Sequence, residues 1–155
     1  MKTIESFKVN HLKLKSGLYV SRKDTYNNVV ATTFDLRFTM PNKEAVMDSD
    51  GIHTIEHLGA TFLRNSIIKD KVIYFGPMGC RTGFYLVMFT DLTSVDVYPI
   101  VKEMLEFIIN FEGEIPGASP IECGNFSEQN LKKAKIYAKN YYNRLTTEKS
   151  FIYEE

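Results

Sequence analysis

The apolar residues of this chain occur in short runs, and this limits the folds that the chain can form. The longest run of large apolar side chains covers residues 84–89, and a second run covers residues 72–75. The glycine-rich segment 76–83 lies between them, so we expect the two runs to form an antiparallel pair of strands. A membrane-spanning helix needs roughly 20 apolar residues, and we therefore expect no membrane partner.

Two further segments, residues 12–21 and 29–38, also have strand character, with a turn at residues 23–28 between them. Side chains of two kinds alternate in the second segment: Phe34, Leu36 and Phe38 fall on one face, and Asp35 and Arg37 on the other. Alternation of this kind is typical of a strand that packs one face on a core and leaves the other face outside it.

Three segments have helical character. Residues 49–65 carry apolar side chains at helical spacing, and a second helix begins after a cap at Thr93 or Ser94, with Asp96 in its first turn. For the last helix, which is rich in lysine, we predict Ser127 as the N-cap. Strands and helices in blocks favour an α+β fold, an antiparallel sheet with helices packed on one face.

The size and charge of the chain limit its partners. It has 155 residues, and since no linker divides it we expect a single domain, 1–155. The 19 basic and 19 acidic side chains give a formal net charge of zero, which is not the basic footprint that a nucleic-acid partner requires. Residues 1–6 lack the apolar core of a secretory signal, so we expect a cytoplasmic protein.

The most informative motif is His53-Thr54-Ile55-Glu56-His57. Histidines four residues apart lie one helical turn apart on the same face, where both imidazoles can bind one cation. Glu56 projects beside them and can move a proton next to a metal without being a ligand. A solvated helix face that carries two histidines and a glutamate is the alternative.

A catalytic metal site usually has three protein ligands and an open position, so a third ligand is needed. The two cysteines, Cys80 and Cys123, are the candidates, and thiolate with two imidazoles suits Zn²⁺ or Fe²⁺. Arg81 follows Cys80 and favours a reactive thiolate there. We therefore assign Cys123 to the metal and Cys80 to the chemistry, with an inert buried cysteine as the alternative for each.

These motifs resemble the signature of the S-ribosylhomocysteine lyase family, the autoinducer-2 synthases known as LuxS. The resemblance rests on residues 51–58, 64–65, 77–85 and 123–124, together with residues 34–38 and 41–42 and with Ser6, Phe7 and His11 near the start. It covers essentially the whole chain. Three positions depart from the family pattern: Tyr74 stands where the family usually has an acid, Ser66 where it often has histidine, and Phe126 where it has tyrosine.

The resemblance implies a LuxS-like metalloenzyme fold and a homodimer with its active sites at the subunit interface. Each site would hold one divalent metal, Fe²⁺ natively, with Zn²⁺ or Co²⁺ able to substitute. The residues implied fall into three groups: the metal ligands His53, His57 and Cys123, the catalytic acid/base residues Glu56 and Cys80, and the substrate-binding residues Ser6, His11 and Arg37. The family cleaves S-ribosylhomocysteine, an intermediate of the methionine cycle, to homocysteine and 4,5-dihydroxy-2,3-pentanedione, the precursor of autoinducer-2 in quorum sensing.

Two other functions fit part of the pattern. The arrangement His53-x-x-Glu56-His57 also occurs in inverzincin metallopeptidases, which need a carboxylate as the third ligand and usually a much longer chain. A non-catalytic structural metal site is the other alternative. Such sites are usually closed by four ligands, so Cys80 would then have to bind the metal as well.

Overall fold

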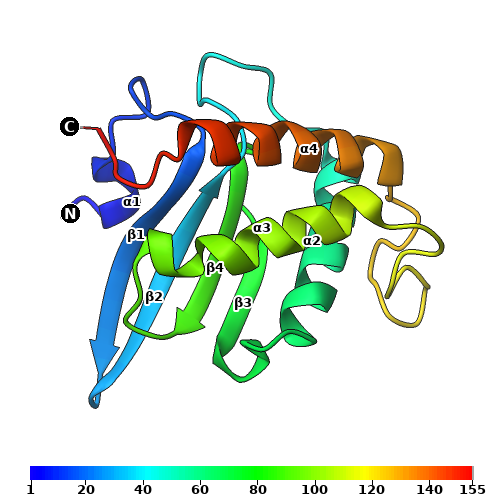
Figure 1. Cartoon of the computed structure of the whole chain (residues 1–155), viewed down its shortest axis with the longest axis horizontal. Coiled ribbons are helices and arrows are strands. Elements are labelled where there is room, and N and C mark those ends of the chain that lie inside the picture. Colours follow the sequence, from blue (N-terminus) through cyan, green and yellow to red (C-terminus); the bar gives the residue numbers. More distant parts are fainter. Residues whose placement is uncertain (155) are drawn as a thin grey trace.

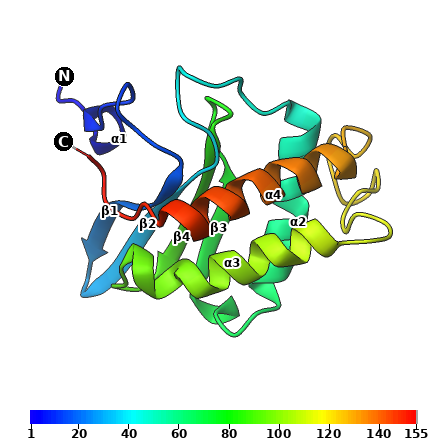
Figure 2. The ribbon, with the colours of Figure 1, turned by 45° about the horizontal axis from the view of Figure 1, so that its top comes forward.

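A computed structural model describes residues 1–154, and residue 155, the last of the predicted domain, lies outside the described residues. Four strands form one antiparallel sheet in the order β1-β2-β4-β3, and the three long helices lie against one of its faces (Figures 1 and 2). The elements are α1 (Glu5–Lys8), β1 (Gly17–Tyr26), β2 (Val29–Arg37), α2 (Ser49–Arg64), a 3₁₀ turn η1 (Lys69–Lys71), β3 (Val72–Pro77), β4 (Gly83–Phe89), α3 (Ser94–Asn110) and α4 (Leu131–Glu148). The predicted α+β class, with helices on one sheet face, is confirmed.

The hairpin of β1 and β2 is longer than the sequence predicts. Only Asn27 and Asn28 form its turn, and both have left-handed φ angles, 46° and 64°. Two such residues in succession match the twist of the flanking strands, and asparagine tolerates this conformation better than most residues. The prediction of a strand at residues 12–21 followed by a turn at 23–28 was therefore wrong, because β1 begins at Gly17 and continues to Tyr26.

The side chains of β2 alternate as predicted. Phe34 and Leu36 are completely buried under the helices, and the ring of Phe38, just past the strand, stacks on Tyr141 of α4. Residues on the other face include Asp35, which pairs with Tyr85 of β4. The core thus lies between one sheet face and the helices, and β2 separates it from the opposite face.

The turn between β3 and β4 carries Cys80. It is closed by a hydrogen bond from the Met78 amide to the Gly83 carbonyl, 2.9 Å, and Arg81 adopts a left-handed φ of 59°. Gly83 allows the two neighbouring strands to approach closely, because a Cβ atom there would lie 2.3 Å from the carbonyl oxygen of Leu36. The turn therefore lies beside the end of β2, where Arg37 is located.

The caps of the last two helices differ in how well the sequence predicts them. Thr93 caps α3 and forms a capping box with Asp96, in agreement with the sequence. Asn130, and not Ser127, caps α4, since its side chain accepts a hydrogen bond from the amide of Lys133. The residues just before Asn130 instead belong to a loop whose carbonyl at Glu128 contacts His53.

The three long helices lie on one side of the sheet and leave its second face uncovered (Figure 1), whereas the short α1 contacts the edge strand β1. It presents aromatic and aliphatic side chains of β3 and β4, namely Tyr74, Tyr85, Val87 and Phe89. Tyr74 and Phe89 are each about half exposed, at 51% and 52%. We call this set of four residues the open-face patch.

An ion pair between Glu44 and Arg144 ties the segment after β2 to α4. Two nitrogens of the Arg144 guanidinium donate to the two carboxylate oxygens of Glu44, one of them at 2.7 Å. The hydrogen bonds from Arg144 hold the pKa of Glu44 below its ordinary value of 4.5. A carboxyl group with a lowered pKa in the folded chain adds stability above its unfolded pKa, and that stability is lost as the pH falls through the folded pKa.

We expect Glu44→Gln to lower the free energy of unfolding by about 1 kcal/mol at neutral pH, the usual scale for a partly buried two-point ion pair. The difference from the parent protein should begin to shrink as the pH falls below about 4.5 and should vanish once the pH is below the lowered pKa of Glu44 in the folded chain, where both proteins lack the charge. Urea unfolding at a series of pH values measures this. Glu103→Gln on the exposed surface of α3 is the control, and a pH-independent difference for Glu44→Gln would contradict the assignment.

Candidate active site

Three side chains from two parts of the chain converge beside α2. His53 and His57 lie one turn apart on the helix, and their Nε2 atoms are 2.9 Å apart. Cys123 comes from the long loop between α3 and α4, and its Sγ atom is 3.4 Å from Nε2 of His53. The three ligand atoms lie within 4.8 Å of one another, so the predicted set of metal ligands is brought together as one group.

The outer nitrogen of each imidazole is held by the same loop. Nδ1 of His57 lies 2.7 Å from the carbonyl oxygen of Pro116, and Nδ1 of His53 lies 2.8 Å from that of Glu128. A carbonyl oxygen only accepts hydrogen bonds, so each Nδ1 must carry the proton. In the neutral rings both Nε2 atoms then present lone pairs to each other, and such an arrangement is stable when a cation lies between them.

The donor set fits a divalent metal ion. Two ligands held about 2.05 Å from one tetrahedral ion lie roughly 3.3 Å apart, so the imidazoles would separate by only a few tenths of an ångström to accommodate it. Two imidazoles and one thiolate suit Zn²⁺ or Fe²⁺, and three protein ligands leave a position for a substrate oxygen. We therefore identify His53, His57 and Cys123 as a candidate metal site.

Glu56 lies on α2 between the two histidines in sequence. Its side chain is partly exposed, and among residues 1–154 it has no hydrogen-bond or ion-pair partner. A carboxylate that is not already paired is free to accept and return protons.

Cys80 lies in the exposed turn between β3 and β4. Its Sγ atom is 3.1 Å from the hydroxyl oxygen of Thr82 and 3.9 Å from Nη1 of Arg37. The structure therefore gives the thiol a cationic neighbour. That neighbour is Arg37 from β2, whereas the sequence pointed to Arg81.

Arg37 belongs to a buried network that the sequence analysis did not recognise. Its Nη2 donates to Oδ2 of Asp35 at 2.6 Å, and its Nη1 donates to Thr82 at 2.8 Å. The same oxygen of Asp35 accepts a hydrogen bond from the hydroxyl of Tyr153, 2.9 Å away, near the C-terminus. The charged residues that alternate with apolar ones in this strand could have indicated an ion pair of Asp35. Nothing in the sequence linked Asp35 to Tyr153.

The network is almost completely removed from solvent, and this affects the charge of Asp35. Asp35 and Arg37 are only 2% and 3% exposed. Burial raises the pKa of Asp35 above its ordinary value, and the charge of Arg37 and the hydrogen bonds from Arg37 and Tyr153 oppose that rise. Two polar atoms of the pair, Oδ1 of Asp35 and Nε of Arg37, have no partner within the described part of the chain.

Ser6 and His11 are not brought to the metal ligands within this chain. Ser6 is on α1, which contacts β1 at one edge of the sheet, whereas α2 contacts β3 at the other edge (Figure 1). His11 follows α1, and its Nδ1 contacts the carbonyl oxygen of Val9 at 2.8 Å. Within one chain the two residues therefore lie at the far side of the sheet from α2.

The fold and the site together define an α+β protein with a candidate metal centre of two histidines and one cysteine. The family model of S-ribosylhomocysteinase (LuxS) matches residues 4–151. The chain therefore belongs to this family of enzymes.

Similar proteins with the name S-ribosylhomocysteine lyase occur in several bacteria. One from Finegoldia magna is 57% identical, and the alignment covers all of both chains. One from Clostridium acetobutylicum is 55% identical over 91% of this chain and 90% of its own, and one from Borreliella burgdorferi strain ZS7 is 52% identical with the same coverage. Each alignment thus covers nearly the entire length of this chain and of the relative.

Gly117 permits a test of how the loop holds His57. It has a φ of +72°, and a Cβ atom there would lie 3.2 Å from Nδ1 of His57, close to the bond with Pro116. Gly113 in the same loop also has a positive φ, +102°, but a Cβ atom there would meet nothing within 4 Å. The two glycines therefore share a backbone requirement and differ in their contact with the imidazole.

We expect Gly117→Ala to weaken Co²⁺ or Zn²⁺ binding by about 10-fold or more, the lower end of the effect of disturbing an outer partner of a ligand. Gly113→Ala should lower stability through backbone strain alone and keep the metal affinity. Metal titration together with thermal unfolding separates the two effects. Equal metal affinity in the two variants would show that the loop does not position His57.

Proposed function

We propose that this chain cleaves S-ribosylhomocysteine to homocysteine and 4,5-dihydroxy-2,3-pentanedione. The observation that carries the proposal is the convergence of His53, His57 and Cys123, with Glu56 next to His57 on the same helix, in a member of the S-ribosylhomocysteinase family. The relatives named S-ribosylhomocysteine lyase support the same substrate. The free thiols Cys80 and Cys123 suit a reducing compartment, so we place the reaction in the cytoplasm.

The substrate dictates which groups are required. A thioether is eliminated readily when it lies β to a carbonyl, but the carbonyl of the ring-opened ribose is at C1 and the sulfur is on C5. The carbonyl must therefore move to C3 in two isomerisations, each of which removes a proton from one carbon and adds one to its neighbour. Loss of the C4 proton then expels homocysteine. Each step needs a group that takes up and returns protons.

We assign these proton transfers to Glu56 and Cys80. The carboxylate of Glu56 has no partner among residues 1–154 and lies between the two histidines in sequence, so it can act on oxygen atoms near the metal ligands. The thiol of Cys80 is exposed, and the charge of Arg37 at 3.9 Å favours the thiolate form that acts as a base. Arg37, held beside Cys80, is our candidate for binding a substrate oxygen or the homocysteine carboxylate, as the family resemblance implies.

His53, His57 and Cys123 would hold the divalent metal, which we expect to be Fe²⁺, with Zn²⁺ or Co²⁺ as substitutes. When bound, such an ion supplies Lewis acidity that polarises carbonyl and hydroxyl oxygens and makes neighbouring C–H groups more acidic. The carbonyl groups of Pro116 and Glu128 keep the two imidazoles in the tautomer that a metal requires.

We further propose that the active unit is a homodimer joined through the open-face patch, Tyr74, Tyr85, Val87 and Phe89. An apolar sheet face without a covering helix is typical of an interface. A dimer also provides a route by which Ser6 and His11, which lie far from α2 in their own chain, can line the pocket of the partner. The ring of Tyr74, at the position where the family usually has an acid, lies over Gly76 within this patch, so it would face the interface.

The two alternatives account for less of the structure. A metallopeptidase would need a carboxylate as the third ligand, whereas Cys123 contacts His53 in this chain. A closed structural site would need a fourth ligand, and the group that converges here has three members among residues 1–154. Neither alternative uses the contact between Cys80 and Arg37.

The decisive experiment is incubation with S-ribosylhomocysteine and measurement of released homocysteine as free thiol. We expect release by the parent protein, and a loss of at least about 100-fold in Cys80→Ala and Glu56→Gln with metal content retained. Cys123→Ala should lose metal and activity together while the fold survives. Loss of metal in Cys80→Ala would favour the structural site, and undiminished release would remove Cys80 from the chemistry.

The dimer is tested by Val87→Asp, which places a charge in the centre of the open-face patch. We expect this variant to sediment as a monomer and to lose at least about 10-fold in activity, because burying an unpaired charge at an interface is strongly unfavourable. Val95→Asp is the control, since Val95 is 60% exposed at the start of α3, on the helical side. A fully active dimer of Val87→Asp would show that the subunits use another surface.

A further inference from the structure

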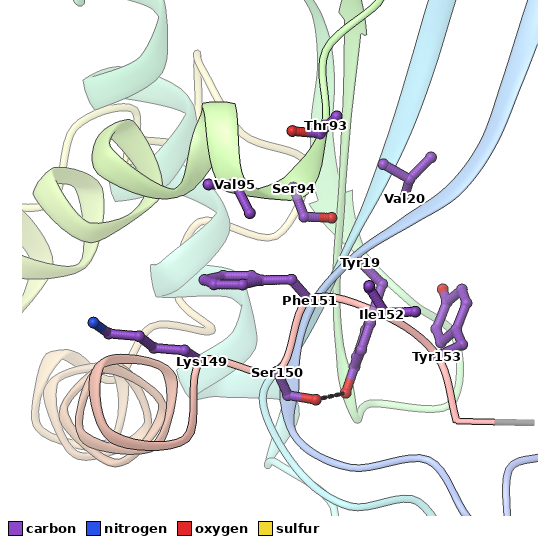
Figure 3. A pocket seen from close by; sticks show the side chains of 10 residues that line it. All are labelled: Tyr19, Val20, Thr93, Ser94, Val95, Lys149, Ser150, Phe151, Ile152 and Tyr153. Atoms are coloured by element: carbon purple, nitrogen blue, oxygen red, sulfur yellow. Dashed lines mark hydrogen bonds between the residues drawn. The ribbon is translucent and has the colours of Figure 1, made fainter.

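The C-terminal segment after α4 crosses the edge of the sheet at β1. Lys149 ends α4 with a left-handed φ of 49°, and the carbonyl of Ser150 accepts a hydrogen bond from the amide of Leu18. Ser150 also bonds the hydroxyl of Tyr19 at 2.8 Å. Tyr153 then lies beside Tyr19 with the two rings stacked 4.5 Å apart (Figure 3). The segment thus reaches from the helical side of the sheet to the side of Asp35.

Apolar packing and an exposed ion pair also hold this segment: the ring of Phe151 meets that of Tyr98 edge to face, and Glu154 pairs with Lys15. Together with β1 and the start of α3 it borders an open groove of about 780 Å³, lined by Val20, Val95 and Phe151 among others (Figure 3). Ile152, next to Tyr153, is 83% exposed. The hydroxyl of Tyr153 is one of a small number of polar anchors, and it is the one that reaches the buried carboxylate of Asp35.

The hydroxyl of Tyr153 acts as a donor throughout the physiological pH range. Burial, and then the charge of Asp35, raise the pKa of Tyr153 far above its ordinary value of 10.0, so the hydroxyl keeps its proton. It donates to the same oxygen of Asp35 that accepts from Arg37. With Oδ1 unpartnered among residues 1–154, these two groups are the donors that fix this carboxylate.

The position of Asp35 decides where the guanidinium of Arg37 lies. One nitrogen of the planar group is held by Asp35, and the other consequently points to Thr82 and to the sulfur of Cys80. A planar fork held at one end has little freedom at the other. A rotation of the Asp35 carboxylate would therefore displace Arg37 from Cys80.

We propose that Tyr153 is a positioning residue for Cys80: its hydroxyl fixes Asp35, and Asp35 holds Arg37 beside the thiol. The residue lies outside residues 4–151, which the family model matches. The inference rests on the proposed lyase reaction only for the role of Cys80 in proton transfer. The contacts that link Tyr153 to the sulfur of Cys80 do not depend on a substrate.

The test is Tyr153→Phe in the full-length, metal-loaded protein, which removes the hydroxyl and keeps the ring that stacks on Tyr19. We expect the rate of Cys80 alkylation by iodoacetamide at neutral pH, followed by peptide mass spectrometry, to fall by about 3-fold or more. We expect kcat for homocysteine release to fall by about 10-fold, the scale of one hydrogen bond to a charged group, with KM within about 2-fold.

Tyr19→Phe is the matched control, because it removes the hydroxyl that bonds Ser150 in the same segment and leaves the bond to Asp35 intact. Tyr19→Phe should keep both the alkylation rate of Cys80 and kcat for homocysteine release near those of the parent protein. Asp35→Asn is a second variant, which should lower the alkylation rate as Tyr153→Phe does. Circular dichroism and sedimentation check that each variant keeps its fold and oligomeric state.

Three outcomes overturn the proposal: unchanged alkylation and kcat in Tyr153→Phe, equal losses in Tyr153→Phe and Tyr19→Phe, or a slower alkylation in Tyr153→Phe that Asp35→Asn does not reproduce. The second would show that docking of the segment matters and the hydroxyl does not. Failure of the lyase function is distinguished by the parent protein. If the parent releases no homocysteine while Tyr153→Phe still slows the alkylation of Cys80, the proposed function fails and the positioning role remains.

Discussion

The alternation of side chains along β2 is the constraint on which both the core and the site depend. Phe34 and Leu36 are fully buried beneath the helices, while Asp35 and Arg37 face the other way and are almost as completely buried. Isolating an ion pair from water costs much of what its attraction returns, so such a pair is weak evidence for stability. In our proposal, the ion pair instead serves to hold Arg37 beside the sulfur of Cys80. One strand therefore supports the fold with one face and the thiol with the other.

The candidate metal site depends on a different principle, which is the ordering of two imidazoles by backbone carbonyls. Helix geometry brings His53 and His57 to one face, but it leaves each ring free to rotate and to choose its tautomer. The loop between α3 and α4 removes both freedoms through Pro116 and Glu128, and it also delivers Cys123. This explains how a long loop without a regular element can carry function.

The dimer that we propose would complete features that the single chain leaves open. Oδ1 of Asp35 and Nε of Arg37 lack partners in the part of the chain that the structure describes, and the open-face patch beside them has no helix over it. Ser6 lies near β1, at the opposite edge from α2. A second subunit across the sheet would cover the open-face patch and would allow Ser6 to line its partner's site, which is why we propose the dimer as the active unit.

The sequence by itself determined the features that follow from local spacing. The period of the apolar residues predicted strands and helices, and their order in blocks predicted helices on one sheet face. Thr93 or Ser94, with Asp96 in the first turn, predicted the cap of α3, which is Thr93. The interval between His53 and His57 predicted their shared face. The need for a third ligand, with Arg81 beside the other cysteine, predicted Cys123 as their partner, the resemblance to the family implied the same, and the convergence of the three residues supports it.

Contacts between distant segments were decided only by the tertiary structure. Asn27 and Asn28 adopt left-handed φ angles and form the whole turn, so β1 continues to Tyr26, beyond the predicted end of the strand. The cap of α4 is Asn130 and not the predicted Ser127, because the loop before Asn130 contacts His53 through the carbonyl of Glu128. The neighbour of Cys80 is Arg37, and the partner of Asp35 is Tyr153, 118 residues away. No local pattern records such contacts, because they arise only when packing brings β1, β2 and the C-terminal segment together.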